Sequence, residues 1–393
     1  MPRPFVFILF FTAIFLQAGT YGLTFMLPKL FQTFGANEKV VGQMLFVTAI
    51  VTIVFVYFSG HLADRFGRVA TLAYACLLIA VSLILYGTSV SVGASIYLAS
   101  ALLGAGWGLT YTLGPIVLAK LVSASERVRY FALLSVFVMA GFGLSPVLAA
   151  AIEAAGHSVS SAFIFTGLLC VISALIFFGL ITPVRQYSEN TAPELQSKLS
   201  LNAVRQLLNS PARVPIFMVC LGACVFAGMN NFQTVFADER GLDYSVFFLV
   251  YTITVVAFRI VLVRFKGGSS PYKVIAILQY VMCFSIVLFL IMPNSLPAYA
   301  LVAFLFGIGY GVSYPVLVAM AANDAPEALL SQALQLFALT YFIGIFGFPL
   351  FAGWMIVEVG TTELLLIVAV VAAIEATMAL VRSRSRSAAA LYD

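Results

Sequence analysis

The sequence predicts an all-α integral membrane protein, with 12 transmembrane helices in two pseudo-symmetric six-helix bundles. Three observations carry this prediction: the composition, the number of long apolar runs and an internal repeat. Of the 393 residues, 63% are hydrophobic and only 9% are charged, and the mean hydropathy is +1.09. A soluble domain carries about 25% charged residues, so lipid must be the solvent for most of this chain.

Twelve apolar runs are long enough to cross a membrane. Each holds about 20 residues, the length of helix that spans about 30 Å of hydrocarbon. The first run follows Met1-Pro2-Arg3 directly, as a signal peptide would, but it reaches Leu30 and eleven runs follow it, so it is predicted to be the first span. In chain order the runs cover residues 5–30, 40–60, 69–88, 95–121, 129–151, 160–181, 212–236, 244–264, 272–292, 297–321, 330–356 and 361–381.

One polar stretch divides the runs six and six. Residues 182–211 contain prolines and five charged side chains. The chain is therefore predicted to form an N-terminal bundle at 1–184, a linker at 185–211 and a C-terminal bundle at 212–393. The end of the linker has apolar residues at helical spacing, which predicts a short amphipathic helix on the membrane surface: Leu201, Val204, Leu207 and Leu208.

The two halves of the chain repeat each other at an offset of 203 residues. Residues 104–111 read GAGWGLTY and residues 307–314 read GIGYGVSY, so glycines align with glycines and aromatic residues with aromatic residues. The same offset aligns Pro146 with Pro349. Glycines at this spacing allow neighbouring helices to approach and slide, and they ease bending.

The basic residues predict the orientation of the chain. If the N-terminus is cytoplasmic, sixteen of the twenty Lys and Arg residues lie inside, and only Lys29, Lys39 and Arg240 lie outside. Basic residues accumulate on the cytoplasmic side, so both termini and the linker are predicted there, in a multi-pass protein of a bacterial inner membrane. The net charge of +5 follows from this orientation and indicates no nucleic-acid partner.

A charged, glycine-punctuated segment, Gly60-His61-Leu62-Ala63-Asp64-Arg65-Phe66-Gly67-Arg68, separates the second run from the third. It resembles the loop between helices two and three of the major facilitator superfamily, whose signature reads roughly G-x-L-A-D-R-x-G-R. The resemblance implies a secondary transporter of two parallel halves related by an axis normal to the membrane. In such a transporter helices 1, 4, 7 and 10 line a central cavity, helices 2, 5, 8 and 11 form the interface, and the others face lipid.

The same resemblance implies a conformational latch formed by Gly60, Asp64, Arg65, Gly67 and Arg68. In the family the aspartate engages the N-terminal dipole of helix eleven and nearby arginines when the transporter is open to the outside. A negative charge at a helix N-terminus contributes about 0.3–2 kcal/mol, depending on burial. The matching place in the second half, residues 263–270, keeps basic residues and glycines but has no aspartate. The acidic latch is therefore expected only in the first half of the chain, at Asp64.

Polar side chains in the four cavity helices are the candidates for substrate binding. They are costly in lipid unless partnered, so they should face the interior, where the alternative is that they only tie helices together. The resulting cavity would be aromatic, lined by amides and nearly uncharged, which suits an amphipathic organic molecule. The candidates are Gln17, Tyr21 and Thr24 in the first run, Trp107, Thr110 and Tyr111 in the fourth, Asn230, Asn231, Gln233 and Thr234 in the seventh, and Tyr310, Ser313 and Tyr314 in the tenth.

Two ionisable residues lie within predicted spans. Arg259 either extends its side chain to the inner interface or provides a counter-charge, for an anionic substrate or for a carboxylate that carries protons. Efflux-type members of the resembled family often have an arginine late in span eight. Glu375 is the only carboxylate deep in a span. Because span twelve should be peripheral, pairing at a helix contact or extension to the interface is favoured over proton coupling.

Two departures separate the chain from the multidrug/proton antiporters of that family. Many of them carry an arginine in helix four, a few residues before a Gly-x-Gly, but here residues 100–103 read SALL. Their helix-five signature ends in Gly-Pro, whereas here Ser145-Pro146 follows Gly141. These differences leave no obvious proton carrier in helix one or four.

The function that these patterns favour is secondary active transport of a small amphipathic or weakly anionic organic molecule by alternating access. The resemblance alone favours export, with membrane lipid as the surroundings and protons as a candidate coupling ion. A proton-linked importer or a uniporter of a small metabolite remains an alternative, as does a scaffold or sensor that transports nothing. No cofactor or metal is expected, because the cysteines lie in apolar runs without neighbouring His or carboxylate residues. An enzyme is disfavoured, because the only histidines are His61 and His157, both near surfaces.

Overall fold

A computed structural model of the chain describes residues 3–122, 127–188, 199–262 and 271–389. Twelve of its helical segments are long and apolar enough to cross a membrane. Within the described ranges the chain forms helices and turns and no strand. The predicted all-α membrane fold of twelve spans is confirmed.

The first six spans form the N half. Span 1 is interrupted by a 3₁₀ turn, which divides it into two α-helices around Gly22 and Pro28. The spans are α1 (Arg3–Gly22) with η1 (Leu23–Met26) and α2 (Leu27–Gln32), then α3 (Glu38–Phe66), α4 (Arg68–Thr88), α5 (Ala94–Leu121), α6 (Arg127–Ala154) and α7 (Val159–Ser188). Helix α7 extends beyond the predicted boundary at residue 184, so the beginning of the expected linker is helical.

The last six spans form the C half. A single π-turn interrupts span 11, where Gly344 packs against α9 so closely that a Cβ atom would lie 2.6 Å from the Cys220 carbonyl oxygen. The elements are α8 (Leu201–Leu208), α9 (Arg213–Asn231) with α10 (Gln233–Glu239), α11 (Tyr244–Leu262), α12 (Pro271–Ile291), α13 (Leu296–Asp324), η2 (Glu327–Leu329), α14 (Leu330–Phe342) with η3 (Ile343–Gly347) and α15 (Phe348–Glu358), and α16 (Thr361–Ala389).

Helix α8 is the short amphipathic helix expected at the end of the linker. Ser200 caps its N-terminus by accepting a 3.1 Å hydrogen bond from the Ala203 amide, which is the usual role of serine at this position. Leu207 is buried, but Leu201 is 90% exposed. The protein therefore covers only part of the apolar face that the sequence predicts for this helix.

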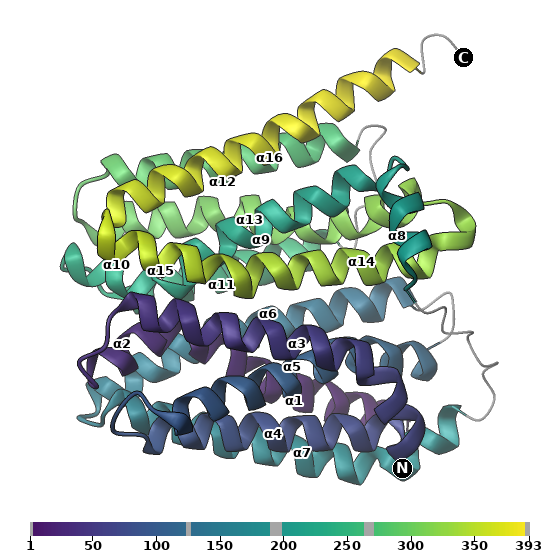
Figure 1. Cartoon of the computed structure of the whole chain (residues 1–393), viewed down its shortest axis with the longest axis horizontal. Coiled ribbons are helices and arrows are strands. Elements are labelled where there is room, and N and C mark those ends of the chain that lie inside the picture. Colours follow the sequence, from purple (N-terminus) through teal and green to yellow (C-terminus); the bar gives the residue numbers. More distant parts are fainter. Residues whose placement is uncertain (1–2, 123–126, 189–198, 263–270, 390–393) are drawn as a thin grey trace.

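The two halves lie side by side, with the purple and blue helices of the N half beside the green and yellow helices of the C half (Figure 1). The start of α1, helix α8 and the end of α16 lie at the same end of the molecule, which we call the terminal end. The turn from α3 to α4 is there as well. The other end, with α2 and α10, is called the opposite end.

The repeated glycines make equivalent close contacts in the two halves. A Cβ atom at Gly106 would lie 2.7 Å from the Ala75 carbonyl oxygen, and one at Gly309 would lie 2.8 Å from the Leu278 carbonyl oxygen. Both residues of the second pair are 203 positions after those of the first. Only glycine permits helices α5 and α13 to approach α4 and α12 in this way. The pseudo-symmetry that the sequence predicts for spans 4 and 10 thus includes the helices that pack against them.

Exposed apolar side chains identify the faces that lipid would cover. Spans 6, 9 and 12 present them along their length, as the family pattern implies. Span 3 differs, because α4 lies between α5 and α7 and buries most of its side chains. Representative exposed residues are Phe165, Leu168, Ile172 and Leu175 on α7, Ile277, Phe284 and Ile291 on α12, and Leu366, Val370, Ile374 and Val381 on α16.

Candidate functional site

Most of the candidates on spans 1 and 4 meet in a buried aromatic layer between the halves. The ring of Tyr21 packs edge-on against Trp107, with 5.0 Å between ring centroids, and it also contacts Phe346 of the C half at 5.7 Å. Below this contact, Gln17 Nε2 donates a 3.0 Å hydrogen bond to Thr110 Oγ1. Span 1 is thus held against span 4, and its aromatic side chain faces the other half.

The C half contributes a cluster of tyrosines to the same layer. Tyr310 stacks on Phe226 of span 7 at 4.5 Å between centroids. Tyr314 hydrogen-bonds through its hydroxyl to the hydroxyl of Tyr111 in the N half. Tyr341 of span 11 stacks on Tyr111 at 5.9 Å. The candidates on spans 4 and 10 are therefore in direct contact across the interface.

Arg259 lies inside this cluster and does not reach a surface. Only 4% of the residue is exposed. Its Nε atom donates a 2.9 Å hydrogen bond to the Gly311 carbonyl oxygen, and one terminal nitrogen donates to Ser135 Oγ at 2.8 Å and to the Ser135 carbonyl oxygen at 3.2 Å. Ser135 belongs to α6, so the guanidinium group joins the two halves. The prediction that Arg259 extends to the inner interface does not describe this conformation.

The acceptors around Arg259 are neutral oxygens. Tyrosine side chains surround the guanidinium group closely enough to interact with it electrostatically: Tyr251, Tyr310, Tyr314 and Tyr341. Within the described ranges no carboxylate forms an ion pair with it. A buried charge that lacks a countercharge is costly, which makes this arginine the most distinctive electrostatic feature of the interface.

The amide candidates of span 7 have separate roles. Asn230 and Asn231 donate from their side-chain nitrogens to carbonyl oxygens of their own helix, at 2.9 and 3.1 Å. Gln233 donates a 2.6 Å hydrogen bond to the hydroxyl of Tyr299 and thereby ties span 7 to span 10 within the C half. In this conformation Gln233 also joins two helices, and the side-chain oxygens of all three amides have no hydrogen-bond partner among the described residues.

Several buried polar atoms of the layer have no hydrogen-bond partner among the described residues. They lie on both halves of the interface. A buried donor or acceptor left without a partner costs about 1–3 kcal/mol, so these atoms are suited to bind a polar molecule that enters the layer. They are Tyr21 Oη, Trp107 Nε1, Asn230 Oδ1, Asn231 Oδ1 and Tyr251 Oη.

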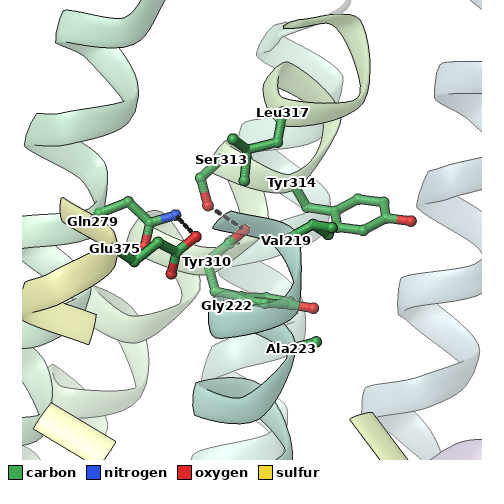
Figure 2. Close-up of a pocket in the computed structure, with 9 residues that line it drawn as sticks. All are labelled: Val219, Gly222, Ala223, Gln279, Tyr310, Ser313, Tyr314, Leu317 and Glu375. Carbon is green, nitrogen blue, oxygen red and sulfur yellow. Dashed lines mark hydrogen bonds between the residues drawn. The ribbon is translucent and has the colours of Figure 1, made fainter. Parts of the chain in front are cut away.

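Ser313 faces a small pocket on the other side of span 10. The pocket has a volume of about 10 Å³, which is close to the minimum that one water molecule requires. It lies between spans 7, 9, 10 and 12, and Glu375 forms part of its wall (Figure 2). A wider groove of about 340 Å³ lies between α1 and α6, and its lining is mostly aromatic and aliphatic: Phe7, Ile8, Phe11, Thr12, Tyr130, Leu133 and Phe137.

The expected latch segment is the end of a helix rather than a loop. Helix α3 continues through Phe66, so Gly60, Asp64 and Arg65 are all helical. The turn consists of Gly67, whose φ angle of +88° favours glycine, and α4 begins at Arg68. The corresponding segment of the second half, residues 263–270, lies outside the described residues.

Asp64 is exposed at the terminal end. No hydrogen bond or ion pair connects it to another residue of the described ranges. Arg65 packs its guanidinium group over the Phe66 ring at 5.4 Å. The contacts that the family resemblance implies for the aspartate belong to the conformation open to the outside, and that role remains a prediction.

Sequence reasoning missed the polar contacts at the opposite end, which include one ion pair and one hydrogen bond between the two halves. Glu153 of α6 accepts a 3.2 Å hydrogen bond from Lys29 Nζ and a 2.5 Å hydrogen bond from the Tyr244 hydroxyl of the C half. Lys39 of α3 pairs with Glu358 of α15. The sequence places only three basic residues on this side of the membrane, and two of them, Lys29 and Lys39, have a carboxylate partner. Their rarity could have indicated these ion pairs.

Close backbone packing accompanies these ion pairs. A Cβ atom at Gly42 would lie 2.3 Å from the Pro349 carbonyl oxygen, and one at Gly353 would lie 2.1 Å from the Glu38 carbonyl oxygen. Helices α3 and α15 are therefore in backbone contact near the opposite end. The halves are closed there, while Asp64 at the terminal end remains exposed.

These features define a class of protein: a helical membrane protein with two pseudo-symmetric halves and a polar layer at their interface, which is the architecture of secondary transporters. Residues 9–349 match the family model of the Major Facilitator Superfamily. The chain belongs to this superfamily, as its segment 60–68 and its internal repeat indicate. Groups of three or more metal-ligating side chains are absent from the described residues.

The relatives of the chain are bacterial transport and resistance proteins. The tetracycline resistance protein, class B, of Escherichia coli is 27% identical over 184 residues, which cover 46% of this chain and only 44% of that protein. The staphylopine export protein of Staphylococcus aureus is 23% identical over 362 residues, 88% of this chain and 87% of that protein. The crystal structure of the nucleoside transporter NupG has the same fold, with a TM-score of 0.73 and 14% identity over 96% of this chain and 99% of that one.

Proposed function

We propose that this protein exports a small amphipathic, weakly anionic organic molecule from the cytoplasm by alternating access. The observation that carries this proposal is the buried Arg259, which lies between the halves with neutral oxygens as its only described acceptors. The substrate would contact residues of both halves, on spans 1, 4, 8, 10 and 11. Its binding and release would therefore depend on how the halves are arranged.

The chemistry around Arg259 suits an organic anion. A guanidinium group has five N–H donors and binds a carboxylate in a bidentate manner. The surrounding tyrosine rings offer flat apolar faces for the body of the molecule. The unpartnered polar atoms of Tyr21, Trp107 and Asn230 can hydrogen-bond to its polar edges. A scaffold that transports nothing would gain nothing from these unpaired groups.

The closed opposite end supports a cycle with two conformations. Here the halves are joined by the Glu153–Tyr244 and Lys39–Glu358 contacts. If the terminal end faces the cytoplasm, as the distribution of basic residues predicts, this conformation is closed to the outside. The latch at Asp64 would then engage in the other conformation. Export as the direction is supported by the relative that is named an export protein.

Reconstitution into liposomes tests this function. Radiolabelled aromatic carboxylic acids, their uncharged amides and tetracycline are suitable probes. We expect uptake of at least one acid to exceed that of its amide. Replacement of Arg259 with Gln should remove this preference, and replacement with Lys should retain part of it. Lys273→Ala, which changes an exposed lysine at the terminal end, is the matched control.

Two results would contradict the proposal. An unchanged affinity of Arg259→Gln for the acid would exclude the arginine as the anion-binding group. Equal transport of acid and amide by the unaltered protein would exclude an anionic substrate. A proton-linked importer or a uniporter is distinguished in the same liposomes, because counterflow without a pH gradient, together with net flux that ignores the gradient, would indicate a uniporter.

A further inference from the structure

Glu375 is a fully buried carboxyl group in the middle of the last membrane span. None of its surface is exposed. Its Oε1 atom accepts a 2.7 Å hydrogen bond from Gln279 Nε2 of α12, which agrees with pairing at a helix contact. Its Oε2 atom has no hydrogen-bond partner among the described residues. One oxygen is thus held in place and the other is free to carry a proton.

The neighbouring helix provides the space for this carboxyl group. A Cβ atom at Gly222 of α9 would lie 2.9 Å from Oε1 and 3.1 Å from Oε2. Any larger residue at this position would displace the side chain of Glu375. Spans 7, 9 and 12 therefore form a fitted site for a carboxyl group, although span 12 was expected to be peripheral.

No cation faces Glu375 among the described residues. The titratable groups that face it are Cys220 and Cys224 on α9, and Tyr310 and Tyr314 across the pocket on α13. On its own helix, the nearest charged side chain is Arg382, two turns further on, which pairs with Asp324 at 3.6 Å. An ionised carboxylate inside a span is costly without such a partner, so this site favours the protonated acid as long as it remains dry.

Glu375 lines a pocket that shares Tyr310 and Tyr314 with the central layer. Figure 2 shows Glu375 on one side of this pocket and Tyr310, Ser313 and Tyr314 on the other. The space, about 10 Å³, is about enough for one water molecule. Tyr310 and Tyr314 also surround Arg259. A rearrangement of span 10 during binding would therefore change the surroundings of both the arginine and the carboxyl group.

We infer that Glu375 is a proton-binding site of this transporter, connected through the pocket beside Ser313 to the substrate layer. In the conformation described here the carboxyl group holds one proton on Oε2. When span 10 moves and water enters the pocket, the O–H bond breaks, the proton passes to that water and the carboxylate remains. Its link to transport rests on the proposed function, but the existence of the proton site does not.

Infrared difference spectroscopy tests the site without any substrate. The full-length protein in lipid nanodiscs would be titrated with acid and base, and the carboxylic-acid C=O band would be followed. We expect a band that disappears in Glu375→Gln and returns with a shifted midpoint in Glu375→Asp. Glu363→Gln, an exposed change on the same helix, should leave the band unchanged. A band that persists in Glu375→Gln, or a protein without any titrating carboxyl band, would overturn the inference.

Flux measurements test the link to transport in proteoliposomes that take up a probe acid. We expect Glu375→Gln to retain substrate exchange in the absence of a pH gradient. Its gradient-driven flux should be about tenfold lower than that of the unaltered protein. If the gradient-driven flux of this variant equals that of Glu363→Gln, Glu375 does not couple protons to transport. If Glu375→Gln does not fold, Glu375→Asp must shift the pH profile of flux, and an unshifted profile overturns the coupling. A failure to find any transported acid would contradict the proposed function and leave the infrared result standing.

Discussion

Tyr111 and Tyr314 hydrogen-bond to each other across the interface, although they are repeat equivalents separated by 203 residues. Equivalent residues of two halves can meet only where the axis that relates the halves passes between them. The pseudo-two-fold axis therefore runs through this tyrosine pair. Arg259, which has no basic counterpart 203 residues earlier, breaks the symmetry beside the axis. If the layer binds the proposed anion, this asymmetric charge would favour one orientation of the bound molecule.

Loss of one hydroxyl of this pair should be more harmful than loss of both. Tyr111→Phe leaves the half-buried Tyr314 hydroxyl without its partner. A fully buried hydroxyl without a partner costs about 1–3 kcal/mol, and we expect a cost at the lower end of this range. The double variant removes both groups and should recover part of that loss. Thermal unfolding in detergent of the unaltered protein, both single variants and the double variant gives the coupling energy. Additive effects of the two changes would show that the hydrogen bond contributes nothing.

Asp64→Asn should reduce transport without destabilising the conformation described here. The residue is exposed and without a described partner, and changes at such surface positions usually alter stability by about 0.5 kcal/mol or less. In the conformation open to the outside the same change removes the proposed latch. A loss of about 1.4 kcal/mol there corresponds to a tenfold change in the equilibrium. We expect roughly this loss of transport, with normal insertion and melting temperature.

The matched control for Asp64 is Glu327→Gln, which changes another exposed carboxylate at the terminal end. It should leave transport unchanged. Normal transport by Asp64→Asn would exclude the latch. A lower melting temperature of Asp64→Asn would instead show that Asp64 stabilises the conformation described here, which its exposed position does not predict.

The sequence predicts the architecture well because the relevant physics is local. Each span needs its own apolar run, and the glycines at 104–108 and 307–311 recur because each packs closely against a neighbouring helix. The offset that aligns Gly106 with Gly309 also aligns Ala75 with Leu278, the residues that they touch. This second agreement is invisible in the sequence, because alanine and leucine carry no motif.

The sequence predicts the site less completely because its contacts join distant segments. Tyr251 and Tyr341 were missed, since spans 8 and 11 were assigned to the interface rather than to the cavity, yet both tyrosines lie beside Arg259. Gln233 is predicted to line the cavity, and the sequence does not reveal that its side-chain nitrogen donates to Tyr299 in this conformation. Helical spacing shows which polar residues share one face of a helix. It does not show which neighbouring helix that face contacts, because this depends on how the two halves pack together.

Glu153→Gln should weaken the closure at the opposite end. The carboxylate accepts from Lys29 of its own half and from Tyr244 of the other half, and an amide loses the charge that strengthens both bonds. Spin labels at Ala36 and Thr362, which lie across this end, would report a population with longer distances. Glu358→Gln should have a smaller effect, because exposed ion pairs contribute about 0.2–1 kcal/mol. Identical distance distributions in Glu153→Gln and the unaltered protein would contradict this role.

Asp238→Asn should stabilise the protein at neutral pH. Asp238 lies on α10, beyond the spanning helix Arg213–Asn231. Partial burial raises the pKa of its carboxyl group, Lys29 lowers that pKa in part and Glu153 raises it, so that the net value lies above the ordinary 3.8. The folded protein thus binds this proton more tightly than the unfolded chain does. The resulting stabilisation is complete below pH 3.8 and is lost as the pH rises through the folded pKa.

At neutral pH the ionised Asp238 therefore opposes folding, and asparagine removes this effect. Melting temperatures measured from acidic to neutral pH should show a gain in Asp238→Asn at neutral pH that disappears as the pH falls. Glu363→Gln, which changes an exposed carboxylate at the same end, should show no such dependence. The opposite result would be a difference in melting temperature between Asp238→Asn and the unaltered protein that grows as the pH falls. It would mean that attraction to Lys29 affects the carboxylate of Asp238 more than its partial burial does.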